Sequence, residues 1–251
     1  MTPSGVQKER ILPDELYVVD IDGAVLSAPE QKPGCRLPKL SDCSPLFLHA
    51  FKQRNAGAVL HSHAICCNIV TSLFEGQSEF RISHQEMIKG INGYGYFDEL
   101  AIPIIENTAW EHELADSLGE AIANNPKACA VLVRRHGMYV WGDTWEQAKR
   151  HGECLHYLFE VAIQMRHCGM DFNSPPRTAA PTGDVVGTKR HGVQSSCDHN
   201  NKRIRPKSFS VVLFDIEGTA IFCTPLPTHI LDSFHRSVLT PFQVLLRRYP
   251  S

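Results

Sequence analysis

The sequence predicts an α/β protein, because short apolar runs alternate with longer amphipathic runs over residues 1–171. Of the 251 residues, 43% are hydrophobic and 21% are charged, an ordinary globular composition that argues against disorder throughout the chain. The formal net charge is −2, which gives no reason to expect nucleic acid or an anionic membrane as a partner. The expected partner is therefore a small molecule rather than a polyanion.

The individual elements follow from apolar spacing and from helix-capping residues. Ser44 and Pro45 begin one predicted helix, and Thr144 with Gln147 forms a predicted capping box for another, which Gly169 ends as the C′ residue. Strands are expected at residues 15–21, 56–61, 129–133 and 138–141, and helices at residues 44–54, 64–73 and 144–168.

The amino-acid composition of the chain changes after residue 171. Residues 172–208 mix Pro, Gly, Ser, Thr and Asn without apolar periodicity, which predicts a flexible linker. Residues 209–214 form a further apolar run that leads into Asp215-Ile-Glu217-Gly-Thr219. The segment 209–251 is too short for an independent α/β domain. We therefore expect one domain at residues 1–171, a linker and a partial second unit.

Cysteine usage and the absence of apolar segments predict the compartment. No run approaches the roughly 18 apolar residues of a membrane span, and the first ten residues lack the apolar core of a secretory signal. The nine cysteines contain no CxxC pair. This pattern fits a reduced cytoplasmic protein better than a disulfide framework.

Histidines form the candidate site. His61 and His63 lie two apart at the end of an apolar run, so both side chains leave the same face of a strand. With 13 histidines in the chain, such a pair alone is a weak signal. His136 also ends a β-run, and Glu86 adds a carboxylate. Three histidines and a nearby acid/base are the parts of a catalytic zinc site, although each histidine could equally be an ordinary surface or core group.

Six segments occur in order over about residues 3–171: Pro-Ser-Gly-Val-Gln-Lys-Glu-Arg-Ile, Cys-Ser-Pro-Leu-Phe, Gly-Ala-Val-Leu-His-Ser-His, His-Gln-Glu-Met-Ile-Lys-Gly, Ile-Pro-Ile-Ile-Glu-Asn-Thr and Val-Leu-Val-Arg-Arg-His-Gly-Met-Tyr-Val-Trp-Gly. Together they resemble the methylthioribulose-1-phosphate dehydratases of the class II aldolase/adducin-like family. The resemblance implies a three-layer αβα fold around a mixed, largely antiparallel sheet. It also implies a homo-oligomer, a tetramer in that family, with sites near the subunit interfaces.

The same resemblance implies the site residues. One zinc per chain would be bound by His61, His63 and His136, Glu86 would donate and accept the proton, and Cys43 would contact the substrate. Ser4 and Gly5 match a segment that helps form a phosphate pocket. The implied reaction removes water from 5-methylthioribulose 1-phosphate and gives 2,3-diketo-5-methylthiopentyl 1-phosphate, in methionine salvage.

This chemistry accounts for the residue types. The C2 ketone acidifies the proton on C3, zinc acts as a Lewis acid, and a desolvated carboxylate can take the proton before the C4 hydroxyl leaves. Cys43 also has a plain alternative as a small buried hydrophobic residue.

Two departures from the family pattern are expected to matter. The family carries an N-terminal helix and a Gly-rich turn ahead of the Pro-Ser-Gly segment, whereas Pro3 already follows Met1 and Thr2 here, so phosphate binding is expected to be affected. The segment around Asp215 and Glu217 resembles the first motif of the haloacid-dehalogenase-type enolase-phosphatases, which plants fuse behind the dehydratase. Asp215 would be the nucleophile and Glu217 the general acid, both near magnesium, but the later residues of that family are not reached, so no phosphatase activity is expected.

Two other functions remain open at this point. A zinc-dependent sugar-phosphate aldolase would use the same metal for carbon–carbon cleavage. A catalytically silent adducin-like binding or scaffold protein would have the same fold but no activity. The presence of the three histidines and Glu86 argues against this function, whereas the departure at the N-terminus argues for it.

Overall fold

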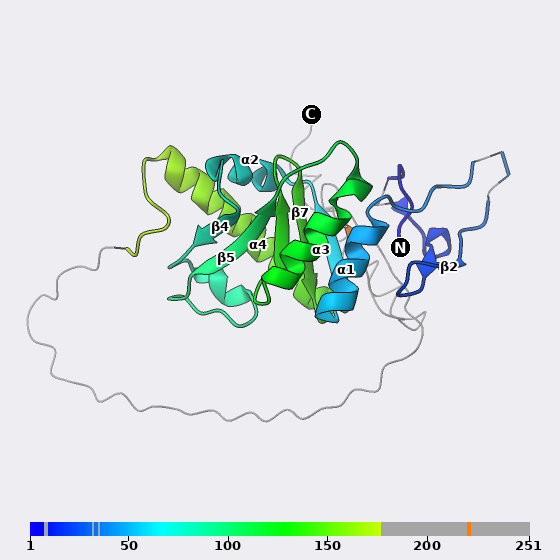
Figure 1. Ribbon diagram of the computed structural model, residues 1–251, viewed down its shortest axis with the longest axis horizontal. Helices are drawn as coiled ribbons and strands as arrows, with labels where there is room; N and C mark the ends of the chain where they lie inside the picture. Colours follow the sequence, from blue (N-terminus) through cyan, green and yellow to red (C-terminus); the bar gives the residue numbers. More distant parts are fainter. Residues whose placement is uncertain (8–9, 32, 35, 177–219, 222–251) are drawn as a thin grey trace, which may run out of the picture.

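The computed structural model describes residues 1–7, 10–31, 33, 34, 36–176, 220 and 221 (Figure 1). The predicted strand at residues 209–214, and with it Asp215 and Glu217, lies outside the described residues.

The described strands form a central sheet and a small accessory sheet. The central sheet has six strands in the order β4-β5-β6-β7-β3-β8, with one parallel pair, β5 with β6, and four antiparallel pairs. The bounds are β3 Ala58–Ser62, β4 Glu79–Ile82, β5 Leu100–Ile105, β6 Ala130–Val133, β7 Gly137–Gly142 and β8 Ala220–Ile221. The expectation of a mixed, largely antiparallel sheet is confirmed.

Helices cover both faces of this sheet (Figure 1). Helices α1 (Ser44–Arg54) and α3 (Ala115–Asn124) pack on one face, and α2 (Ile65–Leu73) and α4 (Trp145–His167) pack on the other. Side chains alternate along each strand, so Val59 and Tyr139 join the core under α1 and α3 while Leu60 and Val140 join the core under α2 and α4. The predicted three-layer αβα architecture is therefore confirmed.

Local signals place α4 as predicted, with one difference. The Thr144 hydroxyl accepts a hydrogen bond from the Gln147 amide at 3.2 Å, and Gly169 has a φ of +72°. The Met170 amide donates to the Met165 carbonyl at 2.8 Å, the bond that closes a Schellman motif. The Gln147 side chain, however, accepts from the Asp143 amide rather than from Thr144, so the capping box is only half formed.

The predicted strand at residues 15–21 is too long. Within it, the paired strand is β1 (Val18–Val19), which lies against β2 (Val25–Ser27) in the accessory sheet. The Asp20 carboxylate accepts hydrogen bonds from the amides of Asp22 and Ala24, at 2.9 and 2.8 Å, and Gly23 has a φ of +92°. This turn ends the strand because its backbone hydrogen bonds go to a side chain instead of a ladder.

Three short 3₁₀ helices complete the described secondary structure: η2 (Pro13–Glu15), η3 (Glu86–Gly90) and η4 (Glu111–Leu114). The last two carry acidic residues that matter to the candidate site.

Packing continues one residue past the predicted boundary at 171. Phe172 is only 7% exposed, belongs to the core under α2 and α4, and has its ring centroid 5.8 Å from that of Phe74. We expect Phe172→Ala to lower the free energy of unfolding by about 3 kcal/mol, because it removes a buried ring and leaves a cavity. Urea unfolding measures this, with half-exposed Met170→Ala as a control expected to stay within about 0.5 kcal/mol. An equal, small effect of both substitutions would show that Phe172 contributes no core packing.

Candidate metal centre

One edge of the sheet gathers the candidate residues. Strand β3 ends at Ser62, β5 ends at Ile105 and β6 ends at Val133, and β7 starts beside them because it runs antiparallel to β3 and β6. His61 is the penultimate residue of β3, and His136 lies in the connection between β6 and β7. Adjacent strand ends thus bring residues 75 positions apart in the sequence to one place, as expected.

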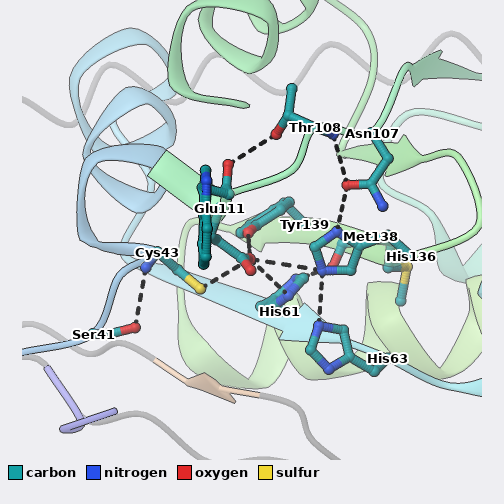
Figure 2. Close-up of polar contacts among 11 residues, drawn as sticks. Ser41, Cys43, His61, His63, Asn107, Thr108, Glu111, His136, Met138 and Tyr139 are labelled. Atoms are coloured by element: carbon teal, nitrogen blue, oxygen red, sulfur yellow. Dashed lines mark hydrogen bonds and ion pairs between the residues drawn. The ribbon is translucent and has the colours of Figure 1, made fainter. Parts of the chain in front are cut away.

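The three imidazoles lie close together around a common centre (Figure 2). The Nε2 atoms of His63 and His136 are 2.9 Å apart, and donor atoms of His61, His63, His136 and Glu111 all lie within 4.8 Å of one another. The structure brings together the three histidines that the sequence singles out, and adds a carboxylate.

The ring orientations suit a metal ion. The Met138 main-chain carbonyl, which can only accept, lies 3.0 Å from Nδ1 of His61, so this nitrogen carries the hydrogen. Nε2 of His61 is then a lone-pair donor; it is buried and has no hydrogen-bond partner among the described residues. His136 is held similarly, with Nδ1 3.2 Å from Oδ1 of Asn107. Distal nitrogens that donate to carbonyl oxygens are a typical arrangement of metal-binding histidines.

Glu111, at the start of η4, is the site residue that sequence reasoning missed. Its Oε1 accepts hydrogen bonds from the Cys43 thiol (3.1 Å) and the Tyr139 hydroxyl (2.5 Å), and it lies 3.3 Å from Nε2 of His61 (Figure 2). The only sequence signal is that Glu111 follows β5, whose end lies at the same sheet edge. Neighbouring Glu106 and Glu113 share that signal, so the sequence could not select among the three.

The protonation states agree with this geometry. Burial lowers the pKa of His63 to about 4, helped by His61 and His136, and burial also lowers the pKa of His136. Burial alone would raise the pKa of the Glu111 carboxyl, but the contacts with His61, Tyr139 and Cys43 outweigh it and hold the pKa well below its usual range. Near neutral pH the His63 and His136 rings are therefore neutral, and the Glu111 side chain beside them is a carboxylate.

Cys43 precedes α1 and stays a thiol at neutral pH. Burial, followed by the charge of Glu111, raises the pKa of its side chain to about 12. Cys43 therefore acts as a hydrogen-bond donor to Glu111, not as a nucleophile.

The turn from β6 to β7 is built to present His136. Arg135 has a φ of +52°, a left-handed conformation that costs energy for a residue with a Cβ, and its amide donates to the Thr71 hydroxyl at 2.9 Å. The Arg134 guanidinium donates to the main-chain carbonyl of Thr71 in the last turn of α2, at 2.8 Å, and to that of Gln77 in the turn that follows α2, at 2.7 Å. These contacts tie the turn to α2 and hold the strained residue in place.

Gly137 allows β3 and β7 to approach beside the histidines. A Cβ built on Gly137 would lie 2.1 Å from the Ser62 main-chain oxygen, which no side chain tolerates. This close approach explains why His136 is followed by glycine.

Comparisons with known proteins show which family has this sequence pattern and fold. Residues 1–163 match the family described as Class II Aldolase and Adducin N-terminal domain. The chain belongs to this family. It is 21% identical to a solved L-fuculose 1-phosphate aldolase, with a TM-score of 0.53 over 69% of this chain and 73% of that one. An aldolase II superfamily protein from Pseudomonas syringae gives a TM-score of 0.50 at 21% identity, over 70% of this chain and 65% of that one. These likenesses show the class II aldolase fold.

Curated relatives are more similar in sequence. A protein of Populus trichocarpa named "Probable bifunctional methylthioribulose-1-phosphate dehydratase/enolase-phosphatase E1" is 49% identical over 243 residues, 96% of this chain and 43% of that protein. A protein of Arabidopsis thaliana with the same name is 46% identical, over 96% of this chain and 44% of its own. The chain thus spans less than half the length of these relatives.

The remaining predicted site residues lie apart from the four clustered donors. Glu86 begins η3, its side chain is 71% exposed, and its carboxylate pairs with Lys89 at 2.9 Å. The Ser4 amide donates to the Lys39 carbonyl at 2.7 Å, and Gly5 has a φ of +70°. This segment therefore runs beside the residues that lead into Cys43.

No helix among the described residues combines the length and apolar character needed to cross a membrane.

The Asn107 contact yields a testable prediction. Asn107→Ala should weaken metal binding at this cluster by about 10-fold, because the partner that orients the His136 ring is lost. Competition with a chromogenic chelator measures the affinity for added divalent metal. Asn124→Ala, at the exposed end of α3, is the control and should bind metal like the parent. Unchanged affinity in the Asn107 variant would mean that the ring is held by its turn alone.

Proposed function

We propose that this chain is a zinc-dependent dehydratase that converts 5-methylthioribulose 1-phosphate to 2,3-diketo-5-methylthiopentyl 1-phosphate in methionine salvage. The observation that carries the proposal is the convergence of three imidazole nitrogens beside Cys43, in a class II aldolase fold. Sequence identity of 46–49% to plant proteins named for this activity supports the choice of substrate.

Three histidines would hold one zinc ion per chain: His61, His63 and His136. When bound, the zinc ion supplies Lewis-acid stabilisation for negative charge that develops on substrate oxygens. The chain's contribution is to aim three imidazoles at one point, with His61 buried at 4% exposure and His63 open to solvent.

Proton transfer is assigned to Glu86. An ionised carboxylate can remove the proton that the adjacent ketone acidifies, and the same group can return a proton to the departing hydroxyl. Cys43 would contact the substrate as a neutral donor, because its thiol remains protonated at neutral pH. Ser4 and Gly5 would help bind the substrate phosphate, because a main-chain turn with a positive φ, such as that of Gly5, is suited to anions.

The region beyond residue 171 is proposed to be a linker, residues 172–208, except that its first residue, Phe172, packs into the core. The start of an enolase-phosphatase unit, residues 209–251, would follow it. The match to the Populus protein covers 243 residues, more than the first 171 can supply, so it includes much of this region. Asp215 and Glu217 would match the phosphoryl acceptor and the general acid of a complete unit, with magnesium as its cation. No phosphatase activity is proposed for this chain.

Product analysis tests the proposed reaction. Zinc-loaded protein incubated with 5-methylthioribulose 1-phosphate should form a diketone, detected by its reaction with a 1,2-diamine. Release of an aldehyde instead would indicate an aldolase, and no turnover with stoichiometric zinc bound would indicate a binding protein. We further propose a cytoplasmic homo-oligomer, a tetramer in keeping with the family, which light scattering can measure.

A further inference from the structure

A second group of metal-ligating side chains lies away from the three clustered histidines. Cys66 and Cys67, in the first turn of α2, and His156, in α4, bring two sulfur atoms and one ring nitrogen within 4.8 Å of one another. Side chains alternate along β3, so Ser62, which contacts His156, faces the layer of α2 and α4, whereas His61 faces the opposite layer. The two groups therefore lie on different sides of the same strand.

The packing of α2 against α4 holds the two cysteines in place. Cys66 is 7% exposed and Cys67 is fully buried, and both belong to the core under these helices. Neither forms a disulfide. The Cys67 amide donates to the Ala64 carbonyl at 2.9 Å, which fixes the first turn of α2. Packing as a small hydrophobic residue explains one buried cysteine, whereas two sulfur atoms beside a ring nitrogen also form a ligand set.

Ser62 orients the ring of His156. Its hydroxyl oxygen lies 2.8 Å from Nε2 of His156 and accepts a hydrogen bond from the Ala64 amide at 3.2 Å. A partner that fixes the orientation of the ring is typical of metal-binding histidines. His156 is half-buried, so it is the member of the group that is most open to solvent.

The kind and number of donors suit a soft metal ion of low coordination number. Thiolate sulfur is a soft ligand, which favours copper(I) and zinc over the harder cations that prefer oxygen. Structural zinc sites use four ligands, whereas this group offers three among the described residues, and both cysteines are shielded from water. Copper(I) is stable with three ligands, so it matches this donor set better than zinc does.

We propose that Cys66, Cys67 and His156 form a copper(I) site, separate from the cluster of three histidines. Copper(I) replaces the thiol protons, which pass to solvent, and neither copper nor sulfur changes its oxidation state. The imidazole cluster and the sulfur-rich group then select different metals by ligand type. This inference does not depend on the substrate or the reaction proposed above.

Competition for copper(I) tests the site in the reduced full chain. Copper(I) is supplied without oxygen as its coloured bicinchoninate complex, and loss of the colour measures transfer to the protein. We expect Cys66→Ser/Cys67→Ser to bind about one tightly held copper(I) ion fewer than the parent, and His156→Gln to hold that ion at least about 10-fold more weakly. Equal copper(I) binding by the parent and the double cysteine variant would overturn the proposal.

Matched variants isolate the cause, which matters because the chain has nine cysteines. Cys154 is 3% exposed and belongs to the same core but lies outside the group, so Cys154→Ala should bind copper(I) like the parent. Melting temperatures of the metal-free variants establish that they fold. His156→Gln, at a half-buried position, keeps the test available if the double cysteine variant is unstable.

X-ray absorption identifies the ligands and separates this proposal from the proposed function. Parent protein loaded with less than one equivalent of copper(I) should show two sulfur ligands and one nitrogen ligand, and coordination by nitrogen alone would overturn the proposal. The His61→Ala/His63→Ala variant should keep the copper(I) ion. If that variant instead bound zinc at the cysteines, the choice of metal would be wrong. Loss of the copper(I) site leaves the three-histidine centre untouched, and failure of that centre leaves the copper(I) site standing.

Discussion

The double variant His61→Ala/His63→Ala is expected to lose zinc and dehydratase activity. Two of the three clustered imidazoles disappear, and the remaining His136 with Glu111 is an incomplete ligand set for a tetrahedral ion. Metal analysis after gel filtration should give about one zinc per chain for the parent and none for the variant.

A matched histidine control isolates the cause. His112 is exposed and adjacent to Glu111 in the sequence, but is outside the cluster. His112→Ala should keep stoichiometric zinc. Retention of stoichiometric zinc by the double variant would contradict the proposed centre and direct attention to Cys66, Cys67 and His156, the second group of possible ligands among the described residues.

Glu86→Gln is expected to keep the fold and the zinc but to lose roughly 10²- to 10⁴-fold in kcat, the usual contribution of a positioned acid/base. The amide is nearly isosteric and cannot carry a proton at neutral pH. The Glu86 carboxylate forms an exposed ion pair with Lys89, and loss of such a pair costs little stability. Steady-state kinetics on metal-loaded protein measures the change.

Another exposed glutamate provides the control. Glu153 pairs with Lys149 on α4 and is 57% exposed, so Glu153→Gln removes a similar ion pair away from the histidines. It should turn over like the parent. If Glu86→Gln did so as well, the proton carrier would be a different group, with Glu111 the next candidate because it lies against the histidines.

Several signals contained within a few residues were read correctly from the sequence, although the strand predicted at residues 15–21 was too long. The helix predicted at residues 44–54 is observed as α1 with the same bounds, and Thr144 and Gly169 delimit α4 as expected. The His61-Ser62-His63 pair could be placed at the end of a strand because apolar alternation specifies a strand and its faces locally. His136 could be added because a strand end followed by glycine is visible in the chain.

The tertiary structure decided what depends on residues distant in sequence. Nothing near Glu111 distinguishes it from Glu106 or Glu113; its place against His61 follows from the pairing of β5 with β6 and the packing of η4. The same is true of Phe172, whose polar surroundings predict a linker but whose ring fills a space beside Phe74. Sequence patterns indicate the local conformation and which side chains share one face of a strand or helix. Contacts between distant segments depend on the order of strands in the sheet and on packing, which no single stretch of the chain encodes. Three histidines and an α/β fold could thus be predicted from the sequence alone, and the carboxylate that completes their cluster could be found only in the folded structure.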